Sequence, residues 1–183
     1  MKKKSSNAQT AYLKTCIQES LLNLLRDKPI GQITITDIAR NAGASRMTIY
    51  RYYDNKEDII RNQIKDLCQS YILTIRQLNL DAVALAPFLF DAFRKNEDLI
   101  KLLINRHLFG LISEYFATYA EEFSIVMGKK SKLTKHEHQY SYGYTAAGIL
   151  SMIKIWVENG MQESNEEMAN ILMKVKLEQA NFK

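Results

Sequence analysis

Residues 46–52 carry the side chains best suited to chemistry, because basic, hydroxyl-bearing and aromatic residues follow one another there. In a helix over 46–53, Ile49 and Tyr53 share one face, which should turn toward a core. The remaining surface carries Arg46, Met47, Thr48, Tyr50, Arg51 and Tyr52. Arginine can pair bidentately with guanine, methionine and threonine methyls can touch thymine methyls, and tyrosine hydroxyls can reach phosphates. This combination is typical of a helix that enters the major groove of DNA.

The segment before this helix is expected to form a second short helix. Ile33 and Ile35 alternate with threonines and could on their own form a short strand, but the capping chemistry favours a helix. Thr36 is a suitable N-cap, Asp37 favours the first turn through the helix dipole, and Gly43 ends the helix. A tight turn then leads into the groove-facing helix.

Caps on either side complete this arrangement. Ser45 is the expected N-cap of the helix over 46–53. Asp54 and Glu57 form an expected capping box for a long helix over 56–78. Lys56 lies beside the start of that helix, where backbone N–H groups favour anions, so we expect it to contact a phosphate.

The order of residues across 33–60 follows a family pattern: a hydrophobic residue with Thr, then Ile-Ala, Gly-x-Ser, an aromatic residue with Tyr, and Lys-Glu. This stretch resembles the helix-turn-helix of the TetR family of bacterial transcriptional regulators, and the resemblance covers residues 8–65. It implies that residues 45–53 form the recognition helix, with Arg46, Thr48 and Arg51 facing the groove. Family members often have Gly or Pro at the position of Met47, which we expect to read bases because it lies on the same exposed surface. It also implies a set of phosphate contacts: Thr36, Ser45, Tyr50, Tyr52 and Lys56.

Positive charge is concentrated near the N-terminus. The net charge is +5 over 183 residues, and residues 1–56 hold ten lysines and arginines against four acidic residues. Basic residues that neutralise phosphates release condensed counterions, so this distribution favours double-stranded DNA as a partner. No stretch approaches the roughly 20 apolar residues that span a bilayer, and two cysteines form no disulfide framework. We therefore expect a cytoplasmic protein with no membrane partner.

Apolar residues recur at helical spacing along almost the whole chain, which predicts an all-α fold. We expect a three-helix DNA-binding domain over residues 1–56, with its helix-turn-helix at about 34–53. A helical effector-binding and dimerisation domain should follow over 57–183. Two capping boxes are expected to open its last two helices: Thr134 with Glu137, and Ser164 with Glu167.

The helix that begins near residue 134 is apolar on more than one face, so it should contact something besides its own core. The small residues Ala147 and Gly148 would let a neighbouring helix approach closely. We expect the same helix of a second subunit there, because a two-fold axis would present two DNA-binding domains to half-sites about one DNA turn apart. The expected homodimer interface comprises Tyr144, Ala147, Gly148, Ser151, Ile155, Met168, Ile171, Leu172 and Val175.

Aromatic and histidine side chains of the second domain could line a pocket for a small-molecule effector. The candidates are Phe88, Phe93, His107, Phe109, Tyr115, Tyr119 and Tyr142. The prediction is a homodimeric repressor that the effector releases from a pseudo-palindromic operator. The alternative is a helical co-regulator or activator whose second domain docks a partner protein.

Catalysis and metal binding have no support in the sequence. It contains no Gly-rich phosphate loop, nucleophile motif or paired-carboxylate pattern. His136 and His138 are two residues apart, so on a helix they would point to different faces and could not bind one metal ion together. We therefore expect no enzyme activity, no catalytic residue, no metal and no cofactor.

Overall fold

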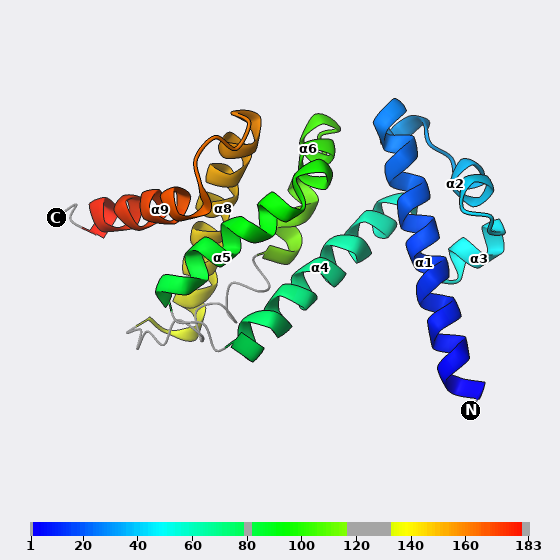
Figure 1. Ribbon diagram of the computed structural model, residues 1–183, viewed down its shortest axis with the longest axis horizontal. Helices are drawn as coiled ribbons and strands as arrows, with labels where there is room; N and C mark the ends of the chain where they lie inside the picture. The colour runs from blue at the N-terminus through cyan, green and yellow to red at the C-terminus, as the bar shows by residue number, and fades with distance from the viewer. Residues whose placement is uncertain (1, 79–81, 117–132, 181–183) are drawn as a thin grey trace. The chain divides into compact units, whose positions relative to one another are not determined.

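The computed structural model describes residues 2–78, 82–116 and 133–180 (Figure 1). Within these ranges every regular element is a helix and there is no strand, which confirms the predicted all-α fold. Among the described helices, none is both long and apolar enough to cross a lipid bilayer. The chain divides into two compact units, Met1–Asp66 and Leu67–Lys183.

The first unit is organised by its N-terminal helix, α1 (Lys2–Asp27). A turn of 3-10 helix, η1 (Ile30–Gln32), leads to α2 (Ile35–Asn41) and α3 (Arg46–Tyr50). α1 packs against α2, and α2 packs against α3, as Figure 1 shows. The three helices bury a shared set of apolar side chains: Ile17, Leu21, Leu25, Ile38, Ala39 and Ile49. The long helix therefore supplies the core against which the two short helices are held.

Helix α4 (Lys56–Leu78) belongs to both units. Its first half adds Ile59, Ile60 and Ile64 to the buried residues of the first unit. The division into compact units therefore falls between residues 66 and 67, inside the helix, whereas the domains predicted from the sequence divide at 56/57, which stays a prediction. Capping residues mark where a helix begins, but one helix can serve two cores in succession, and the sequence does not mark that change.

The second unit contains the end of α4 and the helices α5 (Ala82–Lys95), α6 (Glu97–Asn105), α8 (Lys135–Glu158) and α9 (Asn165–Ala180). Residues 110–116 are also helical. α5 packs against α6 and α9, and α6 packs against α8. Phe90 of α5 meets Trp156 of α8 edge to face, with 5.6 Å between the ring centroids. Both side chains are buried, so this pair lies in the core of the unit.

The predicted capping boxes of α8 and α9 are confirmed. Thr134 Oγ1 accepts a hydrogen bond from Glu137 N, and Glu137 Oε2 accepts one from Thr134 N at 2.7 Å. Ser164 and Glu167 exchange the same two bonds at 3.1 and 2.7 Å. These N–H donors lower the pKa of both glutamates, because they stabilise the ionised carboxylates.

Arg94 of α5 fixes the turn between α8 and α9. Its guanidinium lies 4.7 Å from the centroid of the Trp156 ring. Its Nη2 donates to Glu163 O at 2.6 Å, and its Nε donates to Asn165 Oδ1 at 2.9 Å. Trp156 Nε1 donates to the same Glu163 carbonyl at 3.2 Å. The arginine thus holds the end of α8 and the start of α9 against α5.

Candidate nucleic-acid interface

The start of α2 is fixed by a capping box that lies two residues earlier than expected. Thr34 Oγ1 accepts a hydrogen bond from Asp37 N at 3.1 Å, and Asp37 Oδ2 accepts one from Thr34 N at 3.0 Å. The N-cap is therefore Thr34, and the prediction of Thr36 was wrong. A capping box needs an acidic residue three positions on, and Thr36 has the buried Ala39 there. Thr36 lies exposed in the first turn of the helix.

The turn between α2 and α3 has the expected chemistry. Gly43 has a φ of 62°, a left-handed conformation that glycine adopts without a steric penalty. Ala44 N donates to Ala39 O at 2.9 Å and closes the end of α2. Ser45 Oγ accepts a hydrogen bond from Thr48 N at 3.0 Å, so Ser45 is the N-cap of α3, as predicted.

The exposed and buried sides of α3 follow the prediction. Ile49 is fully buried and Tyr53 is 2% exposed, whereas Met47 is 78% exposed and Tyr50 48%. The other predicted groove and phosphate residues lie on the surface or partly on it: Arg46, Thr48, Arg51 and Tyr52. The helix ends at Tyr50, which is earlier than expected, but Tyr53 N still donates to Ile49 O at 3.0 Å. The side chains therefore keep nearly the directions of a helix over 46–53.

Two cations lie over the ring of Tyr52. The guanidinium of Arg51 is 4.9 Å from the ring centroid, and the ammonium of Lys14 is 5.5 Å from it. Lys14 comes from α1, and no motif in the sequence marks it. In the sequence, Lys14 lies outside the apolar stripe of its helix, and nothing distinguishes it from an ordinary solvent-exposed lysine.

Lys56 makes two contacts that the sequence did not predict. Its ammonium donates hydrogen bonds to Ile30 O at 2.5 Å and to Ile33 O at 2.9 Å, so it ties the two ends of η1 to the start of α4. The carbonyls were invisible in the sequence because they lie more than twenty residues away along the chain. The group predicted to bind a phosphate is thus engaged with the backbone of its own chain.

The capping box predicted at Asp54 and Glu57 is also wrong. Asn55 Oδ1 accepts a hydrogen bond from Asp58 N at 2.8 Å, and Asp58 Oδ2 accepts one from Asp54 N at 3.3 Å. The cap of α4 is therefore one residue further along the chain. Asn55 and Asp58 have the same spacing as Asp54 and Glu57, and Asn caps helices as well as Asp does.

The residues predicted to line an effector pocket are spread over α5, the segment after α6, and α8. Phe93 is buried against Phe116, with 6.2 Å between ring centroids, and Phe88 meets Tyr71 of α4 at 5.8 Å. Tyr142 stacks on His138 at 5.3 Å. The others have varied settings: His107 is exposed with a φ of 58°, Phe109 and Tyr115 are half-buried, and Tyr119 lies outside the described residues.

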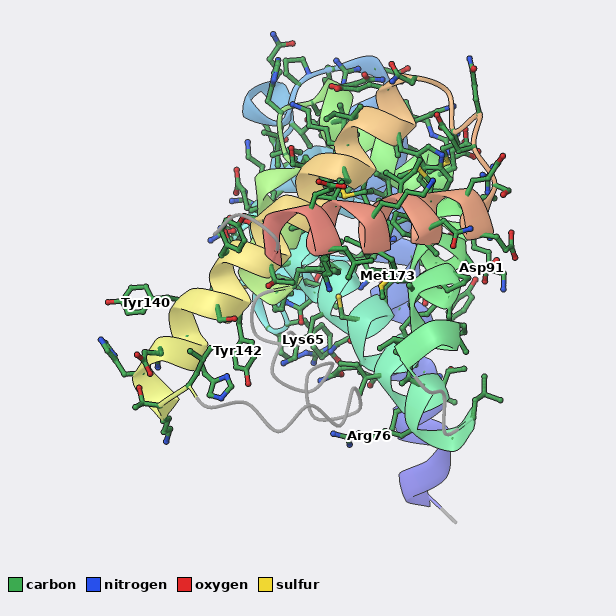
Figure 2. The ribbon with its side chains drawn as sticks, turned by 90° about the vertical axis from the view of Figure 1, so that its left-hand side faces the viewer. Lys65, Arg76, Asp91, Tyr140, Tyr142 and Met173 are labelled. Carbon is green, nitrogen blue, oxygen red and sulfur yellow. The ribbon has the colours of Figure 1, made fainter. Side chains whose placement is uncertain are left out.

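The predicted dimer interface divides into an exposed and a buried set. The α8 residues are all exposed or partly so, as are two residues of α9: Tyr144, Ala147, Gly148, Ser151, Ile155, Ile171 and Val175. Met168 and Leu172 are only 5% and 6% exposed, so their side chains are covered within one chain, and their place in the interface stays a prediction. α9 packs against α5, and these two residues belong to its buried side. Figure 2 shows Tyr140 pointing away from α8 on a different side from Tyr142.

Two family models match the chain. One is described as bacterial regulatory proteins of the tetR family and matches residues 17–62. The other is described as a transcriptional regulator C-terminal region and matches residues 86–176. The first match contains α2, α3 and the start of α4, and the second runs from α5 into α9.

The similar proteins that have names are also HTH-type transcriptional regulators. The uncharacterized HTH-type transcriptional regulator YxbF of Bacillus subtilis is 30% identical over 113 residues, which are 62% of this chain and 26% of YxbF. The HTH-type transcriptional regulator EthR of Mycobacterium tuberculosis is 45% identical over 38 residues, 21% of this chain and 18% of EthR. The chain thus spans about a quarter or less of these relatives.

Solved structures share the fold over nearly the whole chain. Lin0861 from Listeria innocua has a TM-score of 0.79 at 18% identity, covering 92% of this chain and 91% of its own. The dihydroxyacetone kinase operon activator DhaS has a TM-score of 0.59 at 17% identity, covering 91% and 95%. One family model of transcriptional regulators matches the N-terminal part of the chain and a second matches its C-terminal part. The chain therefore belongs to the TetR family of bacterial regulatory proteins.

Proposed function

We propose that the protein is a cytoplasmic, homodimeric, DNA-binding transcriptional regulator, and that it represses its target until a small-molecule effector releases it. The observation that carries the proposal is the surface of α3. Arg46, Met47 and Arg51 are exposed there, while Ile49 and Tyr53 anchor the helix in the core. A soluble helix gains nothing from such a surface, but a major groove can use it.

The DNA contacts divide into two kinds. The residues that would read base edges are Arg46, Met47, Thr48 and Arg51. The residues that would fix the register on phosphates are Thr36, Ser45 and Tyr50. Tyr52, which was predicted with them, differs because two cations lie over its ring. Ser45 and Thr36 lie at the N-terminal ends of α3 and α2, where free N–H groups favour an anion. Lys56 is left out of this set because its ammonium already donates to two carbonyls.

The exposed side of α8 supports a homodimer. Tyr144, Gly148, Ser151 and Ile155 recur every three or four residues, and this stripe carries no charge. Tyr144 is 68% exposed and Ile155 56%, so the chain alone leaves large apolar side chains in water. A second copy of α8 would cover them, with the exposed Ile171 and Val175 of α9 at the edge. Two heads would then meet two half-sites.

The contacts of helix α4 support a way for effector binding to change the position of the first unit. Phe88 of α5 packs on Tyr71 of α4, and Tyr71 Oη donates to Ala92 O at 3.3 Å. Asn96 Nδ2 donates to Tyr71 Oη at 3.3 Å, so α5 holds this part of α4 at several points. A ligand that displaces Phe88 would shift α4, which continues into the first unit. The DNA-binding units of the two subunits would then no longer contact both half-sites at the same time.

Selection from a pool of random double-stranded DNA tests the proposal, because the selection itself reveals the operator sequence. The full-length protein should recover duplexes that share two inverted half-sites with centres about 10 bp apart, or a multiple of that. Arg46→Ala should lose the preference at one position of each half-site while it still binds the pool. Recovery of no common sequence, or of a single half-site, would contradict the proposal.

A further inference from the structure

Two positive groups from different parts of the chain share one aromatic ring. The Arg51 guanidinium and the Lys14 ammonium lie 4.9 and 5.5 Å from the centroid of Tyr52. Both distances are within the ~6 Å at which the face of an aromatic ring attracts a cation. Arg51 follows α3 directly, whereas Lys14 belongs to α1, which lies beside α3 in Figure 1.

The charge of this pair is not neutralised within the described part of the chain. Neither Lys14 nor Arg51 makes an ion pair with a described carboxylate. Lys28, by contrast, pairs with Asp37 at 3.3 Å, and Lys101 pairs with Glu97. Two like charges held at one ring repel each other, and an anion that approaches both would relieve that repulsion.

The position of Lys14 is set by the core. Its helix is anchored by Ile17 and Leu21, both fully buried, so the backbone at Lys14 is fixed relative to α3. Lys14 and Tyr52 are each half-buried. A lysine whose stem is packed and whose ammonium rests on a ring loses less freedom on binding than one that is fully solvated.

We propose that the Tyr52 ring is a platform that positions Lys14 and Arg51 as one cationic cluster, which makes Lys14 a phosphate contact of the DNA-binding surface. This rests on the proposed function and extends it to a residue outside the helix-turn-helix. Tyr52 thereby acts through its ring, as a positioning residue for the two cations, and its hydroxyl is dispensable.

Replacement of Tyr52 separates the ring from the hydroxyl. Tyr52→Phe keeps the ring and should bind double-stranded DNA of random sequence as the unaltered protein does. Tyr52→Leu removes the ring and should bind it about twofold to fivefold more weakly, although no charge is lost. Binding is measured by fluorescence anisotropy on the full chain. A Tyr52→Phe variant as weak as Tyr52→Leu would overturn the platform role, since the hydroxyl would then be the active group.

Lys14→Gln tests the cluster at a surface position that is not expected to affect folding. It should lower the slope of log Kd against log salt concentration by about 1, because one phosphate contact is lost. Combined with Tyr52→Leu it should weaken binding less than the two single effects predict, because both act on the same cluster. Lys101→Gln, which removes a lysine of the second unit, is the control and should leave the slope unchanged.

Two results overturn the inference in distinguishable ways. Normal salt-dependent binding with equal slopes for Lys14→Gln and Lys101→Gln would refute the role of Lys14 and leave the proposed function standing. Absence of salt-dependent DNA binding by the unaltered protein would refute both.

Discussion

The hydroxyl of Tyr53 is buried and makes no hydrogen bond of ordinary geometry with the described residues, although the Gln18 side chain lies near enough to oppose the rise of its pKa. Burial, together with the charges of Asp66 and Asp58, raises the pKa of this phenol to about 12. A hydroxyl that gives up its hydrogen bonds to water on burial, and makes none within the protein, destabilises the folded state. Tyr53→Phe should therefore raise the free energy of unfolding by about 1 kcal/mol, measured by urea denaturation. A less stable variant would mean that the hydroxyl is hydrogen-bonded to Gln18 in solution.

Substitution of Lys56 should affect the free energy of unfolding more than it affects DNA binding. Lys56→Met removes both hydrogen bonds to the carbonyls of Ile30 and Ile33 and should lower the free energy of unfolding by about 2 kcal/mol. Lys65→Met, at an exposed lysine of the same helix, is the matched control and should have little effect. Equal stability of the two variants, with weaker DNA binding by Lys56→Met alone, would restore the phosphate contact expected from the sequence.

Asp37 makes the stability of the first unit depend on pH. The N–H and the hydroxyl of Thr34, and then Lys28, lower its pKa from 3.8 to about 2. Because the folded pKa lies below the unfolded value, the carboxylate stabilises the fold above pH 3.8, and this stabilisation is lost as the pH falls toward 2. Asp37→Asn should flatten the fall of the thermal midpoint between these pH values. A variant that falls as steeply as the unaltered protein would contradict the assignment.

Single residues were predictable from the sequence where one candidate had the required partner. Thr134 was found because Glu137 lies three positions on, and Ser45 because it directly follows the turn at Gly43 and Ala44. Thr34 and Asn55 were missed because a second residue nearby could cap the same helix. The contact of Lys14 with Tyr52 joins two distant parts of the chain, and no local pattern indicates it.

At the scale of elements, periodicity identified the helices but not which side of α9 is buried. Its apolar residues occupy several directions, and only the packing against α5 shows that Met168 and Leu172 point inward. The sequence offered the same chemistry for the inner and the outer positions. The assignment of a helix face to a core or to a partner therefore depends on tertiary packing, which periodicity alone does not contain.

The two sides of the α8–α9 pair should respond differently to substitution. Ile155→Glu puts a charge on the exposed α8 stripe and should leave the protein monomeric with its helix content unchanged, as judged by sedimentation and circular dichroism. Leu172→Ala should instead lower the free energy of unfolding by about 2–5 kcal/mol, because it opens a cavity in the core. A dimer that survives Ile155→Glu would contradict the proposed interface.

For the molecule as a whole, the sequence located the basic first unit and the family, because both depend on local motifs. It did not indicate the division between the compact units at residues 66 and 67, since α4 passes through it without any change in its helical pattern. It also did not locate an effector site, because aromatic residues at helical spacing are equally suited to a core. Phe93, which is buried against Phe116, is an example.

In the proposed function, two copies bind DNA together through their α3 surfaces. The affinity of the unaltered protein and of Ile155→Glu for one duplex with two inverted half-sites, measured from about 50 to 200 mM salt, tests it most directly. The unaltered protein should lose at least about a hundredfold in affinity over this range, and Ile155→Glu should bind far more weakly with a much smaller salt slope. Salt-independent binding, or equal binding by the two proteins, would contradict the claim.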